Sequence, residues 1–355
     1  MKLVRDISVT SAPNHPIGAF IPWDAAWASP TSGTAPGLVM DFAANSYGAG
    51  GIPSTLDGLV SLSRSSEATI INSGGLIETT GNDTLRLTHD PNNLALLGLL
   101  MEQGRQNILT DSDMPIDQSV TVNATPHVLR FYGTGTVTLS GAFVGSVIGN
   151  GVYPTGTELS FTPTSGVLVL DFSGEVVAAQ LEEGNTASSY IASGATPVQR
   201  ADEIATVALG PWYEQTAGTF VFSGHLDGAE ANDRIIEVDN GATSTRLSLL
   251  WNTVLGKPQL QVWNGGSLQA AIAPPGNAIQ LGSPFRVAMS FSENDFAVAL
   301  NGSTTANDVS GTVPAGLTTL RLGRSLGGAQ GLMTIESLIY YPTRLNDAEL
   351  QAISA

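Results

Sequence analysis

The sequence has no cysteine, only two lysines and few charged residues of any kind. Without cysteine, the chain cannot form disulfides, thiolate metal sites or a cysteine nucleophile. Charged residues make up 13% of its 355 residues, and the formal net charge is −17. Because such a surface repels a phosphate backbone, nucleic-acid binding is not expected.

Long apolar runs are also missing. The chain has no run of roughly eighteen apolar residues, so we expect no insertion into a membrane. The start, "MKLVRDISVTSAPNHP", lacks the apolar core of a signal peptide. We therefore expect a soluble protein that is made in a cytoplasm and carries no cofactor.

Turn-forming residues are abundant. The 40 glycines and 19 prolines favour short strands joined by turns over long helices. We predict an all-β fold with two successive β-sandwich or jelly-roll domains, preceded by an extended N-terminal arm. The predicted parts are an arm at 1–36, a connecting β segment at 37–110, a β-sandwich at 111–203 and a jelly roll at 204–355.

The arm contains two large aromatic residues, Trp23 and Trp27, among four prolines in "HPIGAFIPWDAAWASPTSGTAPG". Proline removes a backbone donor, so an irregular or edge-strand course is expected. The two indoles either fold back on their own domain or anchor the chain in a neighbouring subunit or larger assembly. Together with the edge-rich sandwiches, this arm leads us to expect a homo-oligomer, most simply a trimer.

Residues 204–355 show the alternation of half-buried strands. "TRLSLLWN" places Leu247, Leu249 and Trp251 on one face, and "DNGA", "WNGG" and "SEND" are hairpin signals. Near the end, "RLNDAELQAISA" has Asn346 with Glu349 three residues later, which is the capping-box arrangement. We predict one short C-terminal helix there.

Several segments, in order, resemble a group of phage and prophage structural proteins. They are "MDFAANSYGAGG", "SRSSEAT", "LRLTHDPNN", "LGLLMEQGRQNIL", "AAQLEEGNTASSYIAS" and "TPVQRADE". The last 150 residues or so resemble the concanavalin-A-like or laminin-G-like jelly roll that such proteins often carry, through "GTFVFSG", "FRVAMSFSENDFAVALNGS" and "LIYYPTRLNDAELQAI". Under this resemblance, residues 63–109 are connecting β structure, and we interpret their polar residues as turn residues.

The resemblance implies a virion structural protein of the tail-fibre, baseplate or head-fibre type, assembled in the host cytoplasm. Its partners would be other virion proteins and a host-surface glycan bound by the C-terminal domain. Two alternatives remain open: a polysaccharide-degrading enzyme of the appendage, and a capsid decoration protein without a ligand.

The carboxylate pattern argues against an enzyme. A jelly-roll glycanase can place its carboxylates on one strand as E-x-D-x-x-E, because alternation puts them on one face. The nearest match begins at Glu237 and Asp239, but position 242 is Ala. We interpret the other acidic clusters, Glu182–Glu183 and Glu293–Asp295, as solvated turns.

Metal ligands are sparse. The four histidines are far apart in the sequence, and no zinc-binding spacing occurs. "HDPNN" and "AEANDR" could supply oxygen ligands to calcium, although neither is a complete ligand loop. We therefore predict no metal site, and we leave open whether a calcium ion binds.

One strand offers a candidate sugar-binding surface that is better supported than the catalytic and metal-site candidates. In "KPQLQVWNGG", Leu260 and Val262 share one face of the expected strand, whereas Gln261 and Trp263 share the other. An indole can stack on the apolar face of a pyranose while amides bind its hydroxyls. We predict that Trp263, Gln261 and Asn264 form the carbohydrate site, unless another part of the protein covers the indole.

Overall fold

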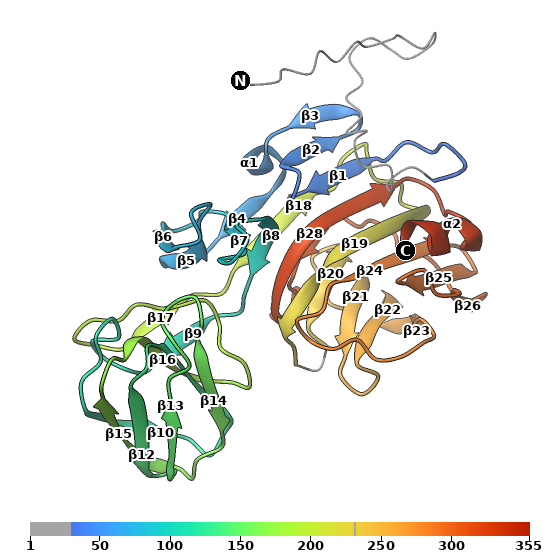
Figure 1. Cartoon of the computed structure of the whole chain (residues 1–355). Coiled ribbons are helices and arrows are strands. Elements are labelled where there is room, and N and C mark those ends of the chain that lie inside the picture. Colours follow the sequence, from blue (N-terminus) through green and yellow to red (C-terminus); the bar gives the residue numbers. More distant parts are fainter. Residues whose placement is uncertain (1–29, 231) are drawn as a thin grey trace, which may run out of the picture.

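The computed structural model describes residues 30–230 and 232–355, and strands dominate these ranges. The predicted all-β class is confirmed. Figure 1 shows two lobes: a larger one that holds both ends of the described chain, and a smaller one built from its middle. Trp23 and Trp27 lie outside the described residues, as does nearly all of the arm.

The larger lobe is a sandwich of two antiparallel sheets. In spatial order the first sheet contains β26 (Ala306–Asp308), β25 (Asp295–Leu300), β24 (Phe285–Ser292), β19 (Ala217–Gly228), β28 (Leu332–Tyr341), β1 (Leu38–Asp41), β2 (Ser46–Ala49) and β3 (Ile52–Ser54). The second contains β23 (Ser267–Ile272), β22 (Lys257–Asn264), β21 (Arg246–Asn252), β20 (Arg234–Asp239), β27 (Thr319–Leu322), β18 (Ile204–Ala208) and β4 (Ser61–Ser63). The main hydrophobic core lies between these sheets.

Alternation along the strands fills this core. Leu247, Leu249 and Trp251 of β21 are at most 3% exposed and belong to the core cluster, as predicted. At one end, the ring of Tyr340 lies 4.6 Å from that of Phe220 between centroids. Aromatic packing of this kind supplies much of the apolar burial that holds two sheets together.

The segment predicted as a connection, residues 37–110, is part of the larger lobe. β1 pairs with β28, so that Val39 is opposite Ile339, and β4 pairs with β18. β7 (Leu87–His89) pairs with β8 (Leu96–Met101), which pairs with β28. Gly98 is needed in β8, because a Cβ there would lie 2.1 Å from the carbonyl oxygen of Ile335. The hairpin of β5 (Ala68–Ile71) and β6 (Ile77–Thr80) stands beside these strands.

The smaller lobe is a sandwich with its own core. One sheet contains β10 (Gln118–Val122), β15 (Gly166–Ser173), β12 (Thr136–Gly141) and β13 (Gly145–Ile148). The other contains β14 (Thr157–Phe161), β11 (His127–Tyr132) and β16 (Val177–Glu183). Leu129, Phe131 and Leu170 are fully buried between them.

A two-stranded stem joins the lobes. β9 (Arg105–Asn107) leads into the smaller lobe, β17 (Val198–Arg200) leads out of it, and the two strands pair antiparallel. The predicted sandwich at 111–203 is therefore inserted into the larger domain, whereas we expected the two domains to follow one another. The insertion was not foreseen because it depends on pairing between strands about 300 residues apart in the sequence, such as β1 and β28.

Two short helices complete the described chain. α1 (Leu56–Leu59) is a single turn, and α2 (Asp347–Ile353) is the predicted C-terminal helix. The capping box is confirmed: the side chain of Asn346 accepts from the Glu349 N–H, and the Glu349 carboxylate accepts from the Asn346 N–H. Neither helix has the length and apolar character needed to cross a membrane.

Candidate functional site

The predicted carbohydrate residues lie on the outer face of the second sheet of the larger lobe. Leu260 and Val262 are fully buried in the core, whereas Gln261 and Trp263 point the other way and are half-buried. The Trp263 Nε1–H donates to the Gln261 side-chain oxygen at 3.4 Å. Asn264 donates instead to Thr312 Oγ1 at 2.8 Å, so its amide already has a partner within the protein.

Arginines surround this face. The Arg246 guanidinium lies 5.1 Å from the centre of the Trp263 ring, which places a cation on one face of the indole. We name the charged residues here the outer-face cluster; they are Arg234, Glu237, Asp239, Arg246 and Arg321. Their arginine side chains keep 8–14% exposure, so they remain close to solvent.

The two carboxylates of the incomplete glycanase pattern belong to this cluster. Glu237 lies 2.9 Å from Arg234 Nε and accepts the Leu326 N–H at 2.7 Å. Asp239 lies 2.5 Å from Arg321 Nε and accepts the Gly241 N–H. Both carboxylates are therefore engaged in bonds that hold the sheet and its neighbouring loops.

A second charged group lies buried where the two lobes meet. We name it the junction hub; its members are Arg64, Arg86, Glu102, Glu182, Arg200 and Glu203. Each of these residues is at most 2% exposed. Four of them follow or precede strands of the larger lobe, while Glu182 lies in β16 and Arg200 ends the stem.

Arg86 is the centre of the hub. Its Nη2 lies 2.7 Å from Glu102 and 2.6 Å from Glu203, and its Nε donates to Glu203 at 2.7 Å. Arg64 Nη1 lies 2.7 Å from Glu203 Oε1, the oxygen that also accepts from Arg86 Nε. Arg200 Nη1 lies 3.0 Å from Glu102. Ion pairs of this kind are favourable in a protein interior only when further hydrogen bonds satisfy the charges.

The loop after β16 supplies such hydrogen bonds. Ser189 donates its N–H and its hydroxyl to Glu102 at 2.7 and 2.6 Å, and Ser188 donates its N–H to Glu182 at 2.8 Å. Burial alone would raise the pKa of Glu102, but Arg200, Arg86 and the Ser189 donors hold that pKa at about 2. Burial raises the pKa of Glu182, against the effect of its Ser188 hydrogen bonds.

Sequence reasoning missed the hub. Glu182 was interpreted as a solvated turn residue, which is wrong: its exposure is 0% because the 186–193 loop covers it. The motifs that carry the resemblance were the signal that could have pointed to the hub. Each contains one or two of the hub's charged residues: "SRSSEAT", "LRLTHDPNN", "LGLLMEQGRQNIL", "AAQLEEG" and "VQRADE". Local patterns cannot show that these charges meet, because they come from five separate segments of the chain.

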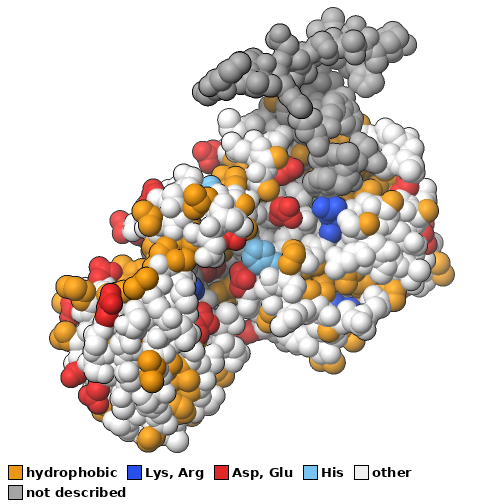
Figure 2. All heavy atoms as spheres, viewed as in Figure 1, with side chains coloured by type: hydrophobic (Ala, Val, Ile, Leu, Met, Phe, Trp, Pro, Cys, Tyr) orange, Lys and Arg blue, Asp and Glu red, His pale blue; other side chains and the backbone are white. Residues whose placement is uncertain are grey.

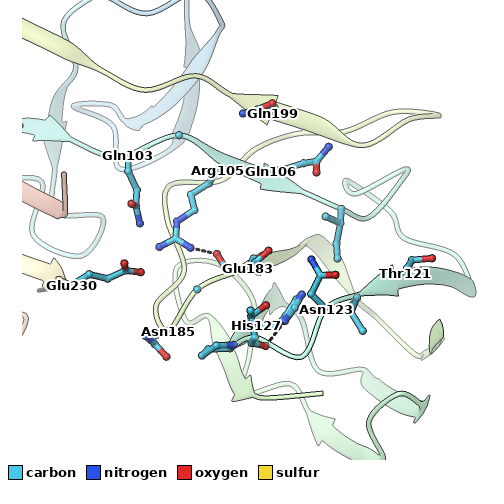
Figure 3. A pocket seen from close by; sticks show the side chains of 16 residues that line it. Gln103, Arg105, Gln106, Thr121, Asn123, His127, Glu183, Asn185, Gln199 and Glu230 are labelled. Atoms are coloured by element: carbon cyan, nitrogen blue, oxygen red, sulfur yellow. Dashed lines mark hydrogen bonds between the residues drawn. The ribbon is translucent and has the colours of Figure 1, made fainter. Parts of the chain in front are cut away.

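Beside the stem lies a polar pocket of about 600 Å³, the stem pocket (Figure 3). Carboxamides dominate its labelled residues: Gln103, Gln106, Asn123, Asn185 and Gln199. Arg105 projects into it and donates to the carbonyl oxygen of Glu183, while Glu230 reaches it from the larger lobe. Amides can donate and accept, which suits a ligand rich in hydroxyls, but no Trp, Tyr or Phe is among the described residues that line the pocket.

Possible metal ligands are not gathered in the described residues. Within 30–230 and 232–355, no group of three or more His, Asp or Glu side chains is placed to hold a metal ion. In "HDPNN", Asp90 accepts the Asn92 N–H at 2.7 Å, which is a turn contact.

These features define an all-β protein in which one sandwich is inserted into another and the two are joined by buried charges. No protein-family model matches the chain, and no curated protein sequence matches it either. Solved structures with some similarity include the CBM40 module of an IT-sialidase from Ruminococcus gnavus bound to α2,3-sialyllactose. It is 20% identical over 40% of this chain and 84% of that one, with a TM-score of 0.35.

Two sialidases show a similar level of likeness. The NanB sialidase of Streptococcus pneumoniae is 13% identical over 39% of this chain and 24% of that one, with a TM-score of 0.33. The leech intramolecular trans-sialidase is 16% identical over 40% of this chain and 23% of that one, also with a TM-score of 0.33. This chain thus spans about a quarter of the length of either enzyme, and the similarity assigns neither a family nor a ligand to it.

Proposed function

We propose that this protein is a structural component of a phage appendage that presents a carbohydrate-binding surface for attachment to the host. The sequence resemblance supports the virion role, and the junction hub adds a physical reason. A buried network of three arginines and three glutamates suits a part that must hold two β domains in a fixed relation. Other virion proteins would bind the N-terminal arm, with the chain assembled as a trimer.

One observation carries the carbohydrate role. Trp263 lies on the outer face of the sheet, half-buried, at the end of a row of amides that continues through Gln261 and Gln259. Arg246 covers part of the indole, so a sugar would stack on the remaining surface and take hydrogen bonds from the amides. Exposed aromatic residues among polar groups are typical of such surfaces.

A glycan array with the full chain tests this role. We expect binding to at least one oligosaccharide, and loss of that binding in Trp263→Ala. Leu255→Ala is the control, because Leu255 lies in the turn between β21 and β22, at the opposite end of β22 from Trp263, and is 41% exposed. Should wild type bind no glycan, the attachment role fails and a decoration protein without a ligand becomes the better account.

The enzymatic alternative has its own test. We propose no catalytic role for Glu237 and Asp239, since both are held by arginines. Release of reducing sugar from a bound glycan, abolished by Glu237→Gln, would overturn that view. Antibody labelling of intact particles would test the virion role, and light scattering would test the trimer.

A further inference from the structure

A second cavity lies where the lobes meet, and it shares no lining residue with the stem pocket. It has a volume of about 460 Å³, within the range of small-molecule sites. We name it the junction cleft. Figure 2 shows the furrow between the lobes, with acidic side chains and a histidine on its walls. Strands β11 and β14, with Tyr153 and the loop 186–190 after β16, form one wall, while strands β5 to β8 and the ends of β19 and β28 form the other.

Three tyrosines from the smaller lobe line one side. The rings of Tyr132 and Tyr153 meet edge to face at 5.2 Å between centroids. Tyr153 donates its hydroxyl to the carbonyl oxygen of Gly75 at 2.6 Å, and Tyr190 donates to Asp113 at 2.7 Å. Tyr153 and Tyr190 keep part of their rings exposed. Because their hydroxyls are bonded, these rings are fixed before any ligand arrives, which lowers the entropy cost of binding.

The opposite wall combines apolar and polar side chains. Its aliphatic side chains come from the β5–β6 hairpin, from β8 and from β28; they are Ile70, Ile71, Ile77, Leu97, Leu100 and Leu332. All but Leu332 are half-buried, so the wall still presents apolar surface toward the cavity. A methyl group would gain from contact there, at the level expected for buried apolar area.

Charges in the cleft come in pairs. Arg130 Nε lies 3.6 Å from Glu158, and His225 Nε2 lies 3.5 Å from Asp227. The side chains of Glu158 and Asp227 are 44% and 42% exposed, so their oxygens can accept hydrogen bonds from a ligand. Arg130 is the only arginine or lysine among the described residues that line the cleft, whereas Glu102, Glu158 and Asp227 all line it. The cleft therefore has no surplus positive charge to attract an anion.

We propose that the junction cleft binds a neutral sugar that carries an acetamido group, such as an N-acetylhexosamine unit of a surface glycan. The tyrosine rings fit the apolar face of the pyranose, and the aliphatic wall fits the acetamido methyl. Glu158 and Asp227 accept hydroxyl or amide protons. This inference rests on the proposed carbohydrate role and assigns it a second site, independent of Trp263.

Titration calorimetry with three trisaccharides tests the assignment: chitotriose, which is neutral and N-acetylated, maltotriose, which lacks the acetamido group, and 3′-sialyllactose, which is anionic. We expect the full chain to bind chitotriose most tightly. Tyr153→Ala should weaken that binding about tenfold or more. Val152→Ala is the matched control, because Val152 is 58% exposed and lies outside the cleft.

A second variant shows whether a loss of binding is caused by unfolding. Glu158→Gln should keep wild-type stability, since its ion pair is exposed, and should weaken chitotriose binding several-fold. Chitotriose binding that survives both variants, or that disappears in Trp263→Ala, overturns the cleft site while the carbohydrate role stands. Preference for maltotriose or sialyllactose at the cleft overturns the proposed sugar class. A chain that binds no sugar here or on the array loses both proposals.

Discussion

The junction hub and the outer-face cluster are built from the same residue types but have different surroundings. In the hub, segments from both lobes bury every charge, and serine hydroxyls and backbone groups make most of the further hydrogen bonds, although Arg200 Nε has no partner among the described residues. In the outer-face cluster, the charges come from neighbouring strands of one sheet; the carboxylates of Glu237 and Asp239 are buried, but the arginines keep 8–14% exposure. The comparison teaches that charges enclosed by two lobes join separate parts of the chain, whereas charges on one sheet leave their arginines and the neighbouring Trp263 partly exposed.

The largest expected effect is in the hub. Glu203→Gln removes the carboxylate that Arg64 and Arg86 share and leaves both guanidinium groups short of a counter-charge. Breaking a buried ion pair from one side costs about 3–5 kcal/mol, so we expect a loss of that size in the free energy of unfolding. Urea denaturation followed by circular dichroism measures it.

Its control is Glu183→Gln, the same chemical change at an exposed position. That variant should stay within about 0.5 kcal/mol of wild type. Equal effects of the two substitutions would remove the distinction between buried and exposed charge.

The second-largest expected effect is a loss of folding stability at low pH, through the hub. The pKa of Glu102 lies at about 2 in the folded protein, below its ordinary value of 4.5. A depressed pKa contributes stability above the unfolded pKa, and this contribution is lost as pH falls from about 4.5 toward 2. We expect a loss on the order of 3 kcal/mol across that window. Glu182, whose pKa is raised, acts in the opposite sense. Urea denaturation between pH 5 and pH 2.5 checks the trend, and a flat profile would contradict it.

A smaller effect is expected in the outer-face cluster. In Glu237→Gln the new side chain can still accept the Leu326 N–H, and Arg234 and Arg246 can turn toward water. We expect a loss of about 1–2 kcal/mol, smaller than the loss of about 3–5 kcal/mol expected for Glu203→Gln. If thermal and urea unfolding showed a larger loss of stability for Glu237→Gln than for Glu203→Gln, the outer-face cluster would contribute more to stability than the hub.

The smallest stability effect should come from Trp263→Ala. The indole is half-buried and loses mainly its contact with Arg246, so we expect a change of about 1 kcal/mol or less. Attachment to host cells should fall sharply in the same variant. A loss of about 3–5 kcal/mol, as for a core tryptophan, would mean that Trp263 packs the protein and binds no sugar.

Local sequence patterns predicted the strands well. Alternation placed Trp251 in the core and Trp263 on the opposite face, and the pair Asn346 and Glu349 marked the C-terminal helix. These features depend on neighbours within a few residues, where strand period and capping chemistry decide the outcome.

The insertion and the hub depend on distant residues. Nothing near Val39 indicates that its partner is Ile339, and nothing near Arg86 indicates that it meets Glu203. A buried charge looks like a turn residue in a sequence, because its partners are supplied by the fold. The junction cleft was missed for the same reason, since its walls come from both lobes.

Differential scanning calorimetry of wild type and Glu102→Gln tests the central claim most directly, namely that the junction hub couples the two lobes. Glu102 follows β8 of the larger lobe and binds Arg200, at the end of the stem, and Ser189, in the loop after β16. Wild type should unfold in one cooperative transition. Glu102→Gln should unfold in two, with the inserted sandwich, which has its own core, melting apart from the larger lobe. Two separate transitions already in wild type, or a single unshifted transition in Glu102→Gln, would contradict the account.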